Sequence, residues 1–104
     1  MLSDIAIDPH RLADFCRRWK ISRLEVFGSA LREDFRPDSD VDLLATFAPD
    51  ADWGLLDHVA MERELSGLLG REIDLVTREA VELSRNPIRR AAILNSARPL
   101  HVPG

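Results

Sequence analysis

Hydrophobic residues near the start of the chain recur every three or four positions, which is the spacing of one face of an α-helix. Asp8 and Pro9 stand before them as an N-cap and a first helical residue, where a proline loses no hydrogen bond. Together these signals predict a helix over residues 9–20. Its buried face is expected to consist of Leu12, Phe15, Cys16 and Trp19. Cys16 should then pack as a small hydrophobic residue and not serve as a reactive thiol.

Three segments have the apolar, β-branched composition of strands, at residues 21–27, 41–47 and 72–77. Between the second and third of them, the apolar residues predict a helix over residues 55–69 that Gly70 ends as a C-cap. The stripe expected to face the core comprises Leu55, Leu56, Val59, Met61, Leu65, Leu68 and Leu69. A strand, a helix and a strand in series favour a crossover that places both strands in one sheet.

The last part of the chain repeats the N-cap and proline signature at Asn86 and Pro87, which predicts a helix to about Ser96. Residues 99–102 are expected to add a short edge strand. We find no internal repeat, linker or low-complexity segment, so the pattern predicts one domain over residues 1–104. The fold class is α/β (α+β), with a small mixed β-sheet packed with helices.

Composition narrows the functional classes. The 104 residues suffice for a single core. The 14 Lys and Arg against 18 Asp and Glu give a net charge of -4, which lacks the basic footprint of a nucleic-acid-binding protein, so we expect no direct nucleic-acid binding. A single cysteine excludes an internal disulfide. With neither a leader nor a long apolar run expected, the sequence predicts a cytoplasmic protein without membrane contact.

Carboxylates gather where two of the predicted strands begin. Asp40 and Asp42 are two residues apart at the start of one strand, so their side chains should point to the same face. Asp74 has the same place in the next strand, and the three carboxylates converge if those strands are neighbours. Because such carboxylates repel unless a cation lies between them, a hard ion with oxygen ligands is the natural occupant, and Mg²⁺ suits a site shared with phosphates.

The pair Gly28 and Ser29 supplies a candidate phosphate site. A strand that ends in glycine lets the backbone approach a phosphate closely, and a helical turn after it would point free N–H groups at the same place. The Ser29 hydroxyl adds a donor, and Arg32, one turn further on, brings a positive charge. Hydrogen-bond donors to phosphate beside metal-binding carboxylates are typical of sites that transfer a nucleotidyl or phosphoryl group.

Each of these features alone has a simpler interpretation, as a turn, a solvated acidic loop or a strand-edge acid. A calcium loop is a sharper alternative, since Asp38, Asp40 and Asp42 imitate its first ligands. Leu43 stands where that loop requires glycine and Pro49 where it requires glutamate, so we reject it. Asp38 is assigned to the turn before the strand.

The remaining candidates carry no chemistry that we can name. The histidines, at positions 10, 58 and 101, have no metal-ligand spacing and are expected at the surface. Trp19 and Trp53 are expected to pack in the core.

Gly28-Ser29, ten residues, and then Asp40-Val41-Asp42, with Asp74 on a separate strand, resemble the nucleotidyltransferase signature of the DNA polymerase β superfamily. The stretches FGSALREDFRPDSDVDLLATF and LLGREIDLVT are similar to its smallest branch, the minimal nucleotidyltransferase (MNT) domain proteins. The resemblance runs from about residue 24 to residue 76 and implies the nucleotidyltransferase fold.

The resemblance also implies roles for individual residues. Asp40 and Asp42 would bind two Mg²⁺ ions, and Asp74 would bind the catalytic one and help to activate the acceptor hydroxyl. Gly28 and Ser29 would hold the triphosphate of ATP.

Of two further positions, Arg32 matches the family pattern and Glu33 departs from it. Arg32 stands where many members have an arginine and would also bind the nucleotide. Glu33 stands where they often have glycine, and it adds negative charge near the triphosphate.

The resemblance to this branch also implies a protein partner. Its members act as antitoxins that transfer AMP from ATP to a tyrosine of a HEPN-domain RNase toxin, which silences it. This chain has no tyrosine, so the acceptor must lie on another molecule. Two alternatives stay open: an antitoxin that masks its toxin without catalysis, and an enzyme that modifies a small hydroxyl compound through a dimer interface. A homodimer and a hetero-oligomer with the toxin are both compatible with the sequence.

Overall fold

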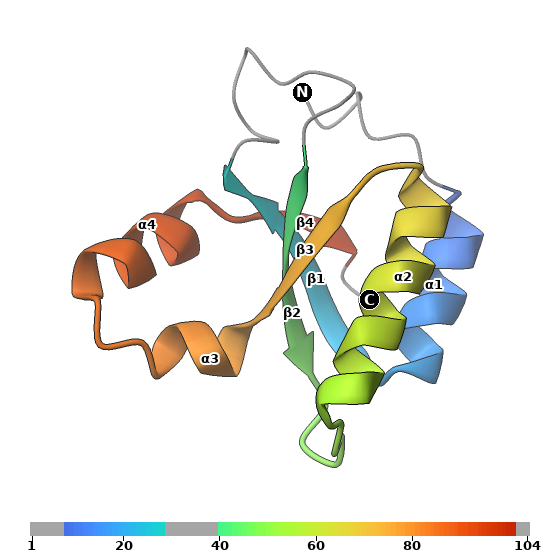
Figure 1. Ribbon diagram of the computed structural model, residues 1–104, viewed down its shortest axis with the longest axis horizontal. Helices are drawn as coiled ribbons and strands as arrows, with labels where there is room; N and C mark the ends of the chain where they lie inside the picture. Colours follow the sequence, from blue (N-terminus) through green and yellow to red (C-terminus); the bar gives the residue numbers. More distant parts are fainter. Residues whose placement is uncertain (1–7, 29–39, 102–104) are drawn as a thin grey trace.

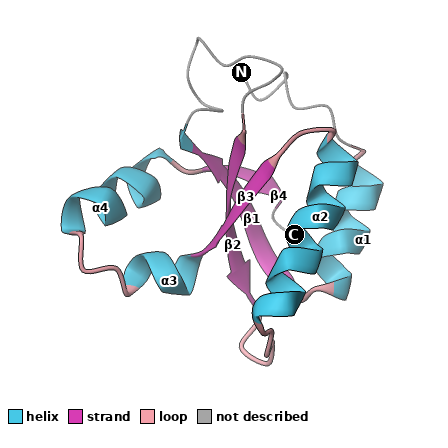
Figure 2. Ribbon diagram, viewed as in Figure 1, coloured by secondary structure: helices cyan, strands magenta, loops and turns pink. Residues whose placement is uncertain are grey.

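The computed structural model describes residues 8–28 and 40–101. In chain order, the elements within those residues are α1 (Pro9–Arg18), β1 (Ile21–Phe27), β2 (Val41–Phe47), α2 (Leu55–Leu69), β3 (Ile73–Thr77), α3 (Arg78–Glu82), α4 (Pro87–Ser96) and β4 (Arg98–His101). The predicted strands and long helices are confirmed, as is the mixed α and β class (Figure 2).

The strands form one mixed sheet in the order β3-β2-β1-β4. β1 pairs antiparallel with both β2 and β4, whereas β2 and β3 are parallel neighbours. Helix α2 therefore makes the predicted crossover between β2 and β3. The expected edge strand is β4. Because β1 and β2 run in opposite directions, the end of β1 lies beside the start of β2, and the start of β3 lies there too.

The helices cover the two faces of this sheet in pairs. Figure 1 looks nearly along the sheet and shows α1 and α2 on one side and α3 and α4 on the other. Side chains of β1 alternate between these layers, with Leu24 and Val26 in the core beneath α1 and α2 and Phe27 in a second cluster with α3 and α4. The second cluster is much smaller than the first.

Helix α1 forms as its sequence predicts. The Asp8 carboxylate accepts a hydrogen bond of 2.9 Å from the backbone N–H of His10, and Pro9 occupies the first turn. Cys16 is 1% exposed, and burial raises the pKa of its thiol to about 12. The thiol is thus a packed hydrophobic group, as expected.

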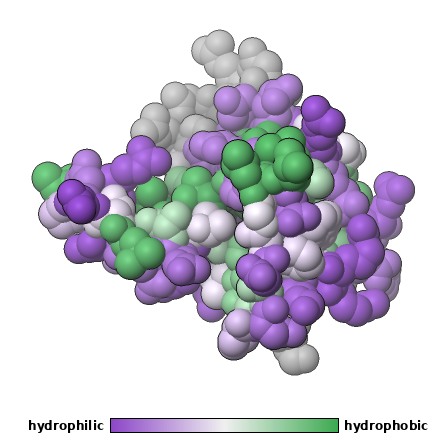
Figure 3. Space-filling view, turned by 60° about the horizontal axis from the view of Figure 1, so that its bottom comes forward, coloured by the Kyte–Doolittle hydropathy of each residue, from purple (hydrophilic) through white to green (hydrophobic). Residues whose placement is uncertain are grey.

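The prediction for the buried stripe of α2 is wrong at its start. Leu55 and Leu56 are 80% and 85% exposed and Val59 is also exposed, whereas Met61 and the two residues at four-residue intervals after it, Leu65 and Leu69, are buried. At 100° per residue, the three exposed residues lie roughly 120–160° around the helix from Met61. They belong to the outer face. Figure 3 shows hydrophobic side chains gathered at the surface of the molecule.

A short helix that the sequence analysis did not predict, α3, follows β3 directly. The Thr77 hydroxyl accepts a 3.2 Å hydrogen bond from the N–H of Ala80 and caps it. Arg78 in its first turn lies 3.5 Å from Glu25, which is buried on β1 at 4% exposure. A buried carboxylate needs such a partner, so the ion pair helps to hold α3 on the sheet.

Among the helices that the structure describes, none combines the length and apolar composition that crossing a bilayer requires.

Candidate active site

Three of the predicted site residues, Gly28, Asp42 and Asp74, meet at one end of the sheet. Phe27, the last residue of β1, pairs with Asp42 on β2, and Asp42 pairs with Asp74 on β3. A cavity of about 660 Å³ opens at this place. Its lining residues are Phe27, Gly28, Asp42, Asp74, Arg89, Ala92, Ile93 and Ser96.

Asp42 and Asp74 face the cavity from adjacent parallel strands. Residues opposite each other in register point to the same face of a sheet, and neighbouring strands lie about 4.8 Å apart. Asp42 is partly buried and Asp74 is exposed. The sequence predicted that these strands lie in one sheet and that the carboxylates converge if the strands are neighbours; their pairing brings two of the three predicted carboxylates together.

Gly28 is fixed at the edge of this cavity by two constraints. Its φ of +72° lies in the left-handed region that residues with a side chain rarely adopt. A Cβ atom at this position would also stand 2.5 Å from the carboxylate oxygen Oδ2 of Asp42, well inside van der Waals contact. The missing side chain therefore leaves the space that the Asp42 carboxylate occupies, so the backbone at Gly28 and this carboxylate pack closely at the edge of the cavity.

Asp40 is placed differently from the other two carboxylates. It is exposed, immediately precedes β2, and is not part of the cavity lining. Within residues 8–28 and 40–101, no three His, Cys, Asp or Glu side chains converge closely enough to hold a metal ion. The three-carboxylate metal site therefore stays a prediction. Ser29, Arg32, Glu33 and Asp38 lie outside the described residues.

The donor set fits a hard divalent cation that is only partly held by protein. Asp42 and Asp74 supply carboxylate oxygens on one face, and Asp40 is two residues from Asp42, which is the spacing that returns a side chain to the same face of a strand. A site with few protein ligands leaves coordination positions for water and phosphate oxygens, as Mg²⁺ prefers.

Helix α4 forms a wall of the cavity that sequence reasoning missed. Arg89, Ala92, Ile93 and Ser96 contribute to the lining at the i, i+3, i+4, i+7 spacing of one helix face. The sequence analysis predicted this helix but gave it no part in the site; of these four residues only Ile93 is buried. A signal was available, since Arg89 and Ser96 interrupt the apolar face with polar groups.

The strand that carries Asp74 is held in place by a side chain from α2. Glu62 Oε2 accepts a 2.8 Å hydrogen bond from the N–H of Leu75, the residue after Asp74. His58, expected at the surface, is partly buried instead, with Nε2 3.8 Å from the same carboxylate oxygen. Because β3 is an edge strand, the Glu62 carboxylate occupies a donor that has no strand partner there.

Replacing Glu62 should therefore weaken the support of β3. We expect Glu62→Ala to lower the free energy of unfolding by about 1 kcal/mol, because a backbone donor loses its partner, and to speed amide exchange at Leu75. Glu62→Gln keeps an acceptor oxygen and should lie between the two proteins. Hydrogen exchange measured by NMR checks this, and unchanged protection of Leu75 in Glu62→Ala would contradict it.

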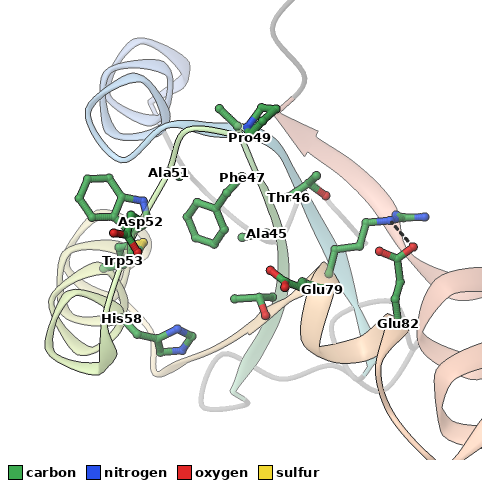
Figure 4. A pocket seen from close by; sticks show the side chains of 15 residues that line it. Ala45, Thr46, Phe47, Pro49, Ala51, Asp52, Trp53, His58, Glu79 and Glu82 are labelled. Carbon is green, nitrogen blue, oxygen red and sulfur yellow. Dashed lines mark ion pairs between the residues drawn. The ribbon is translucent and has the colours of Figure 1, made fainter.

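A second cavity, of about 430 Å³, lies at the opposite end of β2. Phe47, Trp53, His58 and Glu79 contribute to its walls, as Figure 4 shows. None of the residues predicted to act in catalysis lines it. The 660 Å³ cavity is therefore the candidate active site.

Known proteins resemble this chain over most of its length. Residues 11–99 match the family of nucleotidyltransferase domains. A protein of Methanocaldococcus jannaschii that is named as a protein adenylyltransferase is 34% identical over 77 residues, a match that covers 74% of this chain and 76% of that protein.

Solved structures share the fold. A structure described as a minimal nucleotidyltransferase is 36% identical, with a TM-score of 0.66 and 88% of each chain covered. A complex of a tri-AMPylated HEPN toxin of Shewanella oneidensis with an MNT antitoxin is 15% identical, with a TM-score of 0.60 over 91% of this chain and 70% of that one. At that identity, the second likeness shows the fold alone.

Proposed function

Because the chain belongs to the nucleotidyltransferase domain family, as a minimal nucleotidyltransferase, we propose that it transfers AMP from ATP to a hydroxyl group of a protein partner. The partner proposed is a HEPN-domain RNase toxin, the acceptor a tyrosine of that toxin, and the result its neutralisation. The named activity of the 34% identical relative and the AMPylated toxin in the structurally similar complex support this proposal.

One observation carries the proposal. Asp42 and Asp74 stand in register on parallel strands and face a cavity whose rim is a glycine in the left-handed conformation. Paired carboxylates beside a close backbone approach suit a reaction at a phosphate, where positive charge must be held against oxygen atoms. The cavity lies between the end of the sheet and α4, and a second protein would have to present its hydroxyl at its mouth.

In the proposed reaction, the acceptor oxygen attacks the α-phosphorus of ATP and the bond to the β-phosphate oxygen breaks, so that pyrophosphate leaves. Asp74, the more exposed of the two carboxylates in the cavity, is assigned to receive the hydroxyl proton. Asp42, Asp74 and Asp40 would hold two Mg²⁺ ions. When bound, these ions would neutralise charge on the transferred phosphate and on the leaving pyrophosphate.

The test uses the purified protein, the HEPN-domain protein encoded beside it and ATP labelled at the α-phosphate. With Mg²⁺ present, we expect the label on the HEPN protein and a loss of its RNase activity; EDTA should prevent both. ATP labelled at the γ-phosphate is the control, because AMP transfer leaves that label in pyrophosphate. Label transfer from the γ-position would indicate a kinase, and no transfer from either position would contradict the proposal.

The same assay separates catalysis from masking. A protein that only covers its toxin would silence the RNase without ATP, at a one-to-one ratio. A catalyst silences many toxin molecules per molecule of protein, and only when ATP is present. We expect the second result.

A further inference from the structure

We propose that Arg89 on α4 binds the β- and γ-phosphates of ATP in the 660 Å³ cavity, an assignment that rests on the proposed use of ATP. The carboxylates enter this cavity from the sheet, whereas Arg89 enters it from the helix layer. A nucleotide in the cavity would then be contacted from both walls, with its α-phosphate at the carboxylates and its remaining phosphates toward α4.

The charges of the lining residues favour such a group beside the proposed Mg²⁺ ions. Asp42 and Asp74 are negative, and ATP is an anion, so a nucleotide entering the cavity meets like charge. Among the lining residues that the structure describes, Arg89 is the single cation. An arginine presents five donors in a planar fork, which matches phosphate oxygens in a bidentate contact.

Helix stability does not account for Arg89. It is the third residue of α4, and a positive charge in the first turn of a helix is disfavoured by the helix dipole. The first turn contains no acidic residue that would compensate it. The guanidinium has no hydrogen bond or ion pair to any residue that the structure describes. A binding role explains a charge that the local structure does not use.

The neighbouring arginines differ from Arg89 and supply a control. Arg90 Nη1 donates a 2.9 Å hydrogen bond to the carbonyl oxygen of Ser84, so it holds the turn before the helix. Arg85 is exposed in that same turn and does not line the cavity. Arg85→Ala therefore makes the same change in net charge a few residues from Arg89 without entering the proposed site.

Substitution at Arg89 should also leave α4 intact. The helix is capped through the backbone, because the N–H of Arg89 donates a 3.0 Å hydrogen bond to Asn86 Oδ1. A change of side chain retains that N–H. Arg89→Ala is thus expected to fold as the parent does, and its thermal melting temperature verifies this.

The experiment measures binding of ATP and of AMP, each with Mg²⁺, by calorimetry to the parent, Arg89→Ala, Arg89→Lys and Arg85→Ala. We expect Arg89→Ala to weaken ATP binding about tenfold or more and AMP binding by less than twofold, since AMP lacks the phosphates in question. Arg89→Lys, which keeps the charge without the fork, should fall between. Arg85→Ala should bind as the parent does. In turnover assays, Arg89→Ala should raise KM for ATP more than it lowers kcat.

Other outcomes overturn the inference in distinguishable ways. Equal ATP affinities in the parent and in Arg89→Ala would refute the role of Arg89 while leaving the proposed function standing. Equal losses for ATP and AMP, or equal losses in Arg89→Ala and Arg85→Ala, would indicate a general charge effect and refute it as well. A parent protein that binds no ATP would refute both the inference and the proposed function.

Discussion

Asp42→Asn is expected to lower the rate of AMP transfer by about a thousandfold or more while leaving the fold intact. Asparagine has nearly the same shape as aspartate, so β2 and its pairing with β1 and β3 should persist. What disappears is one of the two negative charges that face the cavity in register. A neutral amide is a poor ligand for the cation that this site is proposed to hold. Initial rates with α-labelled ATP and the HEPN partner measure the loss.

A matched control is Asp52→Asn, which makes the same chemical change at an exposed residue beyond the other end of β2. We expect it to transfer AMP at the parental rate. Circular dichroism and thermal melting of both variants exclude unfolding as the cause of any loss. An Asp42→Asn protein that folds and retains more than a tenth of the parental rate would show that this carboxylate is not part of the catalytic site.

Gly28→Ala should have the second largest effect, because it combines a cost in stability with a displaced carboxylate. The left-handed backbone at φ +72° disfavours a Cβ atom by about 1 kcal/mol. The added methyl group would also collide with Oδ2 of Asp42, and the end of a side chain can rotate away. Moving a catalytic carboxylate by about 1 Å costs about a hundredfold in rate. Transfer assays would detect this loss.

Gly70→Ala isolates the backbone contribution. Gly70 ends α2 at φ +67°, but a Cβ atom there would meet nothing within 4 Å. Both variants should therefore lose about 1 kcal/mol of stability in denaturant titrations, whereas only Gly28→Ala should lose activity. Equal activity in the two variants would mean that the contact between Gly28 and Asp42 has no catalytic consequence.

Much of the fold could be read from the sequence because its local signals agree with its tertiary contacts. Asp8-Pro9 and Asn86-Pro87 are helix starts that need no distant partner, and the structure places α1 and α4 immediately after the two N-caps. Helix α3 was missed because its five residues lack an apolar repeat and depend on the Thr77 cap and on Arg78 contacting Glu25.

The exposed start of α2 shows a different limit. A single stripe of seven apolar residues overestimates the buried face, because Leu55, Leu56 and Val59 project from the other side of the helix. The hydrophobic count predicted the helix correctly, and only the angular positions separate the buried face from the exposed one. These angular positions follow from the sequence at 100° per residue.

The part of the site that depends on strand pairing could be predicted from the sequence. The part that depends on which face of the sheet a helix covers could not. Asp42 and Asp74 could be placed together because two strands joined by a helix tend to be parallel neighbours. Arg89 follows Asp74 by only 15 residues, yet its approach to the cavity depends on α4 packing across the face opposite α1 and α2. No local pattern encodes which face a helix covers.

The contact between the two tryptophans gives this protein a convenient optical property. Trp19 and Trp53 meet edge to face with ring centroids 5.2 Å apart, and the Trp53 indole N–H donates a 2.8 Å hydrogen bond to the carbonyl oxygen of Trp19. They are the only tryptophans in a chain without tyrosine. Apart from the weak contribution of phenylalanine, all of its intrinsic fluorescence therefore comes from this pair. The pair adjoins the end of β2 opposite Asp42, roughly 16 Å along the strand. Emission should therefore report unfolding of the α1 and α2 layer and stay constant when the catalytic end fills.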